Sequence, residues 1–294
     1  MLATISSTYL PIALAVIMLG LGLSLTTADF RRVLTQPRAV AVALVVQVLI
    51  LPAIAFGLCL AFALPAELAV GLMVLAASPG GTSANLFSHL ARGDVALNIT
   101  LTAVNSVLAI ISLPLIINLA LVHFIGEGRS VPLQFSKVGQ VVAIVIVPVL
   151  IGMLLRNRRP ALAIRFETPV KLFSVLFLLL LVVLIMVSGW KTIVAHMVSV
   201  GSAALLFNLI SLAIGYNLPR LLGLGRPQAI AIGMEIGVHN SALAIAIALS
   251  PLLLNQPTMA IPATLYSPIM MVTAGLFAFW LTRGHRNHTA HHDE

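Results

Sequence analysis

Long apolar runs, separated by short charged or Pro- and Gly-rich breaks, constrain this chain more than any other feature of its sequence. Sixty per cent of the residues are hydrophobic and only 8% are charged, and the mean hydropathy is +1.12. Soluble domains carry roughly 25% charged residues, so a water-soluble fold is excluded. A membrane-spanning helix needs about 20 apolar residues, and the chain therefore has room for about nine such helices with short loops. We expect an all-α polytopic membrane protein.

The apolar runs fall into four predicted spans before a polar stretch and five after it. The predicted spans are 10–27, 39–62, 68–91, 95–122, 138–155, 170–190, 197–221, 227–254 and 259–282. In this interpretation residues 1–122 form a first repeat, 123–137 a connecting loop, 138–282 a second repeat and 283–294 a cytoplasmic, histidine-rich tail. We expect a solvated tail there, although its histidines leave metal binding open.

Positive charge sets the expected orientation of these spans. If there are nine, alternate loops face opposite sides of the membrane, and one set holds only Arg129, Lys137 and Lys191 of the 16 Lys and Arg residues. Cytoplasmic loops carry the excess of positive charge, so we expect the N-terminus outside and the C-terminus in the cytoplasm. The charge is scattered between apolar runs rather than gathered on one basic face, so the expected partner is the lipid bilayer and not nucleic acid.

Two of the predicted spans are interrupted near the middle by small and polar residues. The interruptions read SPGGTSAN at 78–85 and GMEIGVHN at 233–240, and each lies one span before the end of its half. A single Gly- or Pro-containing interruption is more often a packing kink. Two at equivalent places predict an inverted-repeat transporter with two discontinuous, crossing helices and a binding site where they meet.

Glu235 is the one acidic residue that falls inside a predicted span, and no Lys or Arg falls at a span centre. A central carboxylate costs roughly 2.5–3.5 kcal/mol to insert, so we expect it to face a bound cation, with a protonated glutamate as the alternative. Hard cations such as Na⁺ prefer oxygen ligands. The side-chain oxygens available within the spans belong to Gln47, Asn85, Asn98, Thr102, Asn105, Glu235 and Asn240.

His239 is the one histidine near a span centre, and it could carry a proton or donate a hydrogen bond to a substrate. The N-termini of the second half-helices would present free N–H groups and favour an anion. The nearest side-chain donors would be those of Thr82, Ser83, Asn85, His239 and Asn240.

The sequence also bears on the energy source of transport and on the alternative functions. It holds no G-x-x-x-x-G-K-[ST] phosphate-binding loop, so a gradient must drive transport. Coupling to protons through Glu235 and His239 is the alternative to sodium. A non-transporting receptor or scaffold is a rival of another class. We expect no enzyme and no cofactor, because Ser241 lies two residues from His239 and does not face it on a helix.

The stretches PGGTSAN, HLARGDVALNITLTAV and GMEIGVHNSALAIA resemble the bile acid:sodium symporter family, and the resemblance spans nearly the whole chain. It implies a core domain and a panel domain, two discontinuous helices that cross in the core, and sodium-coupled import of organic anions by alternating access. The absence of a helix before Leu10 resembles the nine-span members of that family.

The resemblance also implies two sodium sites. The first would use the side chains of Asn85, Asn98, Thr102 and Glu235, beside Ala84 where the family usually has serine. The second would use Gln47, Glu235, the backbone carbonyls of Ile236 and Val238, and a glutamine at the position that His239 occupies here. Exchanging an amide oxygen for an imidazole removes a hard ligand from the second site.

The substrate residues expected from the two breaks are Thr82, Ser83, His239 and Asn240. The resemblance leaves the substrate itself open among bile acids, pantoate, 2-oxo acids and other carboxylates or sulfonates. The short chain looks bacterial, and we therefore expect a small carboxylate carried across a bacterial inner membrane.

Overall fold

The computed structural model describes residues 10–126, 135–251 and 253–289 of the 294-residue chain. Within these ranges the ordered elements are helices, joined by short turns, and the only β-type pairing is a single isolated bridge. The predicted all-α class is therefore confirmed for the described part of the chain.

The described residues of the first half form seven α-helices, and a π-helical turn, η2, joins α4 to α5. Its elements are α2 (Leu10–Ser24), α3 (Thr27–Thr35), α4 (Pro37–Val45), η2 (Val46–Ile50), α5 (Leu51–Ala61), α6 (Ala66–Ala77), α7 (Thr82–Leu90) and α8 (Val95–Ile125).

The second half, like the first, ends with a broken helix followed by a long helix. Its elements are α9 (Phe135–Arg158), α10 (Pro160–Ser188), α11 (Trp190–Leu221), α12 (Arg226–Gly237), α13 (Ser241–Leu249), the 3-10 turn η4 (Pro257–Ala260) and α14 (Ile261–Thr289). The predicted loop 123–137 is shorter in the structure, because α8 continues to Ile125 and α9 begins at Phe135, and residues 127–134 lie outside the described ranges. Most of the predicted tail is helical, since α14 continues to Thr289, and residues 290–294 are not described.

By length and apolar composition, five helices of the described residues could cross a membrane: Pro37–Ala61, Val95–Ile125, Pro160–Ser188, Trp190–Leu221 and Pro257–Arg283. A sixth would be the pair Pro11–Ser24 and Thr27–Thr35, which is bent by 60°. The two halves of each broken helix are not among these helices, because each half is too short to cross a membrane alone. The count of nine spans therefore stays a prediction.

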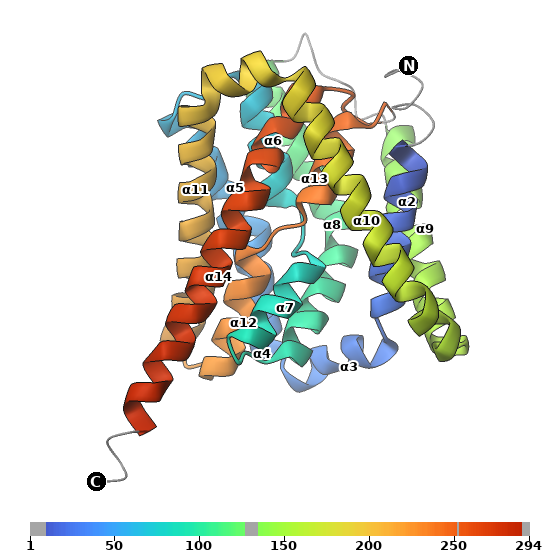
Figure 1. The fold of residues 1–294 in the computed structure, drawn as a ribbon, viewed down its shortest axis with the longest axis vertical. Helices are drawn as coiled ribbons and strands as arrows, with labels where there is room; N and C mark the ends of the chain where they lie inside the picture. Colours follow the sequence, from blue (N-terminus) through green and yellow to red (C-terminus); the bar gives the residue numbers. More distant parts are fainter. Residues whose placement is uncertain (1–9, 127–134, 252, 290–294) are drawn as a thin grey trace.

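Helices α2, α9 and α10 pack on one another and lie together on one side of the molecule (Figure 1). The approach of α2 to α9 is close because glycines line it. A Cβ atom added at Gly152 would lie 2.6 Å from the carbonyl oxygen of Leu19, and one added at Gly22 would overlap the backbone of Val149. Backbones this close leave no room for larger side chains, as is typical of helix pairs in membranes.

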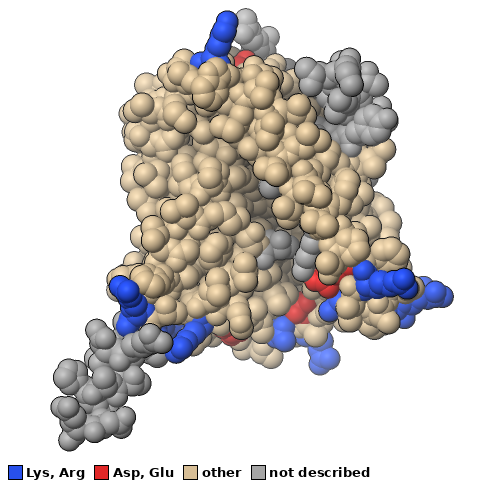
Figure 2. Space-filling model, in the orientation of Figure 1, with Lys and Arg blue, Asp and Glu red and all other residues tan. Residues whose placement is uncertain are grey.

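On the face that Figure 2 shows, the described surface between the two ends of the molecule carries almost no charged side chains. Figure 2 shows Lys and Arg side chains gathered at the end where α3, α4, α12 and the last turns of α14 lie, with few at the opposite end. Large apolar side chains are exposed between them, such as Leu119 at 61% and Val198 at 82%. An apolar belt between polar ends supports an integral membrane protein.

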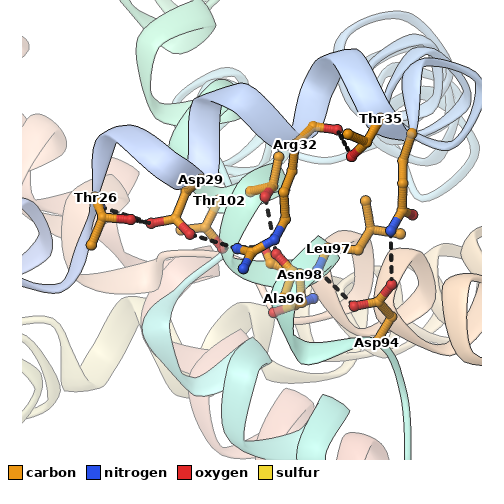
Figure 3. Close-up of polar contacts among 11 residues, drawn as sticks. Thr26, Asp29, Arg32, Thr35, Asp94, Ala96, Leu97, Asn98 and Thr102 are labelled. Carbon is orange, nitrogen blue, oxygen red and sulfur yellow. Dashed lines mark hydrogen bonds and ion pairs between the residues drawn. The ribbon is translucent and has the colours of Figure 1, made fainter.

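The short helix α3 was not predicted, because its charged residues read as a loop. It begins where the Asp29 carboxylate accepts hydrogen bonds from the backbone and hydroxyl of Thr26, and Asp29 also pairs with Arg32 at 2.8 Å (Figure 3). After α3, Gln36 donates to Asp94 at 3.1 Å, and Asp94 caps the start of α8. These bonds tie the segment between α2 and α4 to the beginning of α8.

Candidate ion and anion site at the meeting of two broken helices

The two interruptions in the sequence are breaks between helices in the structure, and the two breaks meet. Helix α6 ends at Ala77 and α7 begins at Thr82, while α12 ends at Gly237 and α13 begins at Ser241. The backbone N–H of Gly81 donates to the carbonyl of Val238 at 2.9 Å, and that of Asn240 donates to Pro79 at 2.9 Å. Gly80 and His239 thus form the isolated antiparallel bridge. The bridge satisfies backbone groups that no helix supplies.

The carboxylate of Glu235 lies at this meeting point and is completely buried. Thr102 on α8 donates its hydroxyl to Oε2 at 2.6 Å, and Asn105, one turn further along, donates its amide to Oε1 at 3.2 Å. The ion pairs among the described residues are Arg32 with Asp29 and Arg156 with Glu167. No basic side chain of the described residues therefore forms an ion pair with Glu235.

Gly80 makes room for this carboxylate. A Cβ atom at position 80 would overlap Cδ and both oxygens of Glu235. The glycine of the first break is thus required sterically by the glutamate of the second, which explains why small residues fill the interruption.

Four side-chain amide oxygens among the described residues are buried without a hydrogen-bond partner: those of Gln47, Asn85, Asn98 and Asn105. The nitrogens of three are held by the protein. The amide of Gln47 donates to Ala76 at 3.3 Å and to Ser78 at 3.1 Å, that of Asn98 donates to Ala231 at 2.7 Å, and that of Asn105 donates to Glu235. A buried polar atom normally has a partner. Unpartnered oxygens near an unpaired carboxylate are the ligands a hard cation prefers.

The structure brings the residues expected for the first sodium site onto neighbouring elements. Asn98 and Thr102 lie one turn apart on α8, which packs against α7 and α12, the helices that carry Asn85 and Glu235. Ala84 is fully buried and offers no side-chain ligand. A cation site built from this set would have one charged ligand, Glu235, and otherwise neutral oxygens.

The residues expected for the second site are also buried, and two of them, Val238 and His239, already have hydrogen-bond partners, whereas the side-chain oxygen of Gln47 has none. Gln47 lies in the π-helical turn η2, a type of distortion that is frequent at functional sites. The carbonyl of Val238 accepts from Gly81, and Nδ1 of His239 lies 2.9 Å from the hydroxyl of Tyr266. Ile236 is completely buried on α12.

A cavity of about 230 Å³ adjoins the two breaks. Three of the four expected substrate residues line it, namely Ser83, His239 and Asn240. The fourth, Thr82, begins α7, and its side chain is not among those that the structure describes. The opposite wall comes from α2 and α10, so the cavity lies between the group of α2, α9 and α10 and the rest of the molecule. The N-terminal ends of α7 and α13 border it, and Asn240 caps α13.

Sequence reasoning missed several residues around the site. Asn105 was expected as a cation ligand but was not placed in a site, although its spacing from Thr102 along α8 could have placed it. Tyr266, Asn208 and Thr273, which bond to one another behind His239, gave no signal, because single polar residues in apolar spans are common as interhelical contacts.

An apolar helical molecule with two broken helices meeting at a buried carboxylate belongs to the class of membrane transporters built on discontinuous spans. Comparison with known proteins narrows the class. The model of the sodium bile acid symporter family matches residues 11–196, and the chain belongs to this family.

Relatives in bacteria, plants and animals are named as sodium-dependent proteins. An uncharacterised sodium-dependent transporter of Bacillus subtilis is 30% identical over 275 residues, covering 93% of this chain and 83% of its own. A probable chloroplastic sodium/metabolite cotransporter of rice is 28% identical over 276 residues, and the alignment covers 93% of this chain but only 64% of the rice protein. The human ileal sodium/bile acid cotransporter is 25% identical over 244 residues, or 82% of this chain and 69% of its own. Such relatives imply a transporter rather than an enzyme.

Proposed function

We propose that the chain is a sodium-coupled symporter that carries an organic anion, small or bile-acid-like, across a bacterial inner membrane by alternating access. Sodium binds at the first of the expected sites, with Glu235 as its charged ligand and the oxygens of Asn85, Asn98 and Thr102 beside it. The N-terminus lies outside and the C-terminus in the cytoplasm.

One observation carries this proposal: a completely buried carboxylate without an ion pair on α12, which packs against α7 and α8, the helices that carry the unpartnered amide oxygens of Asn85, Asn98 and Asn105. A charge in such a place requires a compensating partner. A bound Na⁺ supplies the missing charge and uses the unpartnered oxygens at the same time.

The cavity supports the anion half of the proposal. It lies beside the breaks, where the N-terminal ends of α7 and α13 present backbone N–H groups and partial positive charge. Because the cavity separates two groups of helices, a relative movement of those groups would open it to one side of the membrane or the other. Sodium bound at Glu235 would favour the same arrangement of the breaks that the anion requires.

The test is the thermal stability of the purified protein in sodium against potassium or choline chloride at equal ionic strength. A ligand that binds only the folded protein at about 100 times its Kd stabilises it by about 2.7 kcal/mol. We expect sodium to raise the melting temperature and Glu235→Gln to remove that rise. The matched control is Glu67→Gln, which changes an acid at the start of α6, outside the site.

The outcomes separate the alternatives. A protein that is indifferent to sodium but whose uptake of anions follows a pH gradient would replace sodium coupling with proton coupling through Glu235 and His239. Binding of an anion without any uptake into proteoliposomes would favour a receptor. Normal sodium-driven uptake by Glu235→Gln would refute the assignment of the ion site.

A further inference from the structure

A chain of hydrogen bonds holds the side chain of His239 from behind. Its Nδ1 lies 2.9 Å from the hydroxyl of Tyr266 on α14. The amide nitrogen of Asn208 on α11 donates to that hydroxyl at 2.8 Å and to the carbonyl of Gly237 at 2.8 Å. The hydroxyl of Thr273, two turns beyond Tyr266, donates to the amide oxygen of Asn208. Three side chains on two helices thus fix one ring nitrogen.

Packing fixes the ring as well. The ring centroid of Phe207 lies 5.3 Å from that of His239, and Tyr266 meets the imidazole edge to face at 5.5 Å. Phe207, Asn208 and Tyr266 are all completely buried. The imidazole is therefore held toward α11 and α14, and turning Nδ1 to a cation would break a buried hydrogen bond, which is costly.

The protons available to these groups indicate whether Nε2, the second ring nitrogen of His239, can donate a hydrogen bond. Asn208 has two N–H protons, one for Gly237 and one for the Tyr266 hydroxyl. The Tyr266 hydroxyl also lies 2.8 Å from the carbonyl of Gly237, which is a second acceptor for its proton. Because Asn208 already donates to that carbonyl, Tyr266 can give its proton to Nδ1 of His239 without leaving any of these groups unsatisfied. In that arrangement Nε2 carries the remaining proton of the neutral ring and is a hydrogen-bond donor.

Nε2 of His239 is a buried atom without a partner, and His239 lines the cavity of about 230 Å³. No Lys or Arg is among the described residues that line this cavity. An anion bound there must be held by neutral donors, and Ser83 and Ser241 are among the other residues that line the same space. An N–H on a ring that is held in place and belongs to a residue lining this cavity suits a carboxylate or sulfonate oxygen.

We infer that His239 is a contact for the transported anion and not a sodium ligand, that Tyr266, Asn208 and Thr273 are its positioning residues, and that the chain binds a single sodium ion. This inference rests on the proposed function and deepens it. An imidazole tied to a tyrosine supplies no hard oxygen to a second site, whose Val238 carbonyl already accepts from Gly81. The position that the family resemblance assigns to an ion ligand is in this inference a recognition group.

The ion count is tested with sodium alone, by equilibrium binding of radioactive ²²Na⁺ to the purified protein. We expect one ion per wild-type chain, and two for His239→Gln, which restores an amide oxygen. Two ions on the wild-type chain, or no second ion on the glutamine variant, would overturn the inference. Absence of any sodium binding would instead refute the proposed function, and so the two failures are distinguishable.

The positioning residues are tested with Tyr266→Phe, which keeps the ring and removes the hydroxyl. The assay is uptake into proteoliposomes supplied with pyruvate or taurocholate. We expect the KM for the transported anion to rise about tenfold, because the hydrogen bond from His239 to the charged anion is lost. The half-saturating sodium concentration should stay unchanged. The effect should disappear in the His239→Gln background, where the tyrosine has no imidazole to hold. A purely structural role would change both constants, and that result would refute positioning.

Tyr216→Phe is the matched control, because the Tyr216 ring packs on Phe277, whereas the Tyr266 ring packs on His239, and it should leave both constants unchanged. An equal rise of KM in this control would also overturn the assignment. Uptake of neither anion would count against the proposed substrate class, and the sodium count above would still decide the role of His239.

Discussion

Replacing Gly80 with alanine would place a methyl group in the space that the Glu235 carboxylate occupies. Ordinary van der Waals contact begins near 3.4 Å, so the carboxylate would have to move by about 1 Å to accept the new Cβ atom. Such a shift would lengthen the 3.2 Å bond from Asn105 beyond hydrogen-bonding range. A hydrogen bond to a charged group contributes about 1.5–3 kcal/mol. If the displaced carboxylate loses the same amount of free energy, about 1.5–3 kcal/mol, in its interaction with sodium, the apparent sodium affinity should fall roughly tenfold to one hundredfold.

The assay is a sodium titration of the melting temperature, with potassium replacing sodium so that ionic strength stays constant. Gly57→Ala is the matched control, since a Cβ atom there meets no atom within 4 Å and the position is exposed on α5. Wild-type sodium affinity in a folded Gly80→Ala protein would show that the carboxylate does not contact the ion, and the reasoning would be refuted.

Three further substitutions test other contacts. Thr102→Val removes the hydroxyl that donates to Glu235 at 2.6 Å, and should raise the sodium Kd about tenfold in the same titration, whereas Thr102→Ser should stay near wild type. Asp94→Ala removes the cap of α8 and should lower the free energy of unfolding by about 1 kcal/mol, measured by denaturant titration, whereas Asp94→Asn should retain the cap. Gly152→Ala should cost about 1–3 kcal/mol of stability because α2 and α9 touch there, and Gly201→Ala, with open space around it, should cost nothing measurable.

The sequence predicts those parts of the fold in which composition alone decides the structure. The runs 39–62 and 95–122 coincide closely with Pro37–Ala61 and Val95–Ile125, because apolar length sets where a helix leaves the membrane. The interruptions 78–85 and 233–240 contain the breaks, which are shorter, at 78–81 and 238–240. Glycine and proline do not favour a continuous helix, which is why the interruptions mark the breaks. Helix α3 was missed because its charged residues carry no apolar run.

The sequence indicated individual residues of the candidate site but not the contacts between them. Glu235 stood out because an acid inside an apolar span is costly. The contact of Thr102 with Glu235 joins residues 133 positions apart, and no local pattern encodes such a distance. The hydrogen bonds behind His239 were not predictable either, because they depend on how α11 and α14 pack on α12.

The meeting of the two breaks has a consequence for how the chain is made. Ribosomes add about 5–20 residues per second, so the 133 positions between Thr102 and Glu235 take roughly 7–27 s to synthesise. During that time Asn85, Asn98 and Thr102 are in the membrane, or entering it, without the carboxylate they are to surround. The backbone N–H of Gly81 and the carbonyl of Pro79 likewise have no partner at the second break until Val238 and Asn240 have been synthesised. The polar centre of this protein can therefore assemble only late in its biogenesis, after most of its helices have been delivered to the lipid.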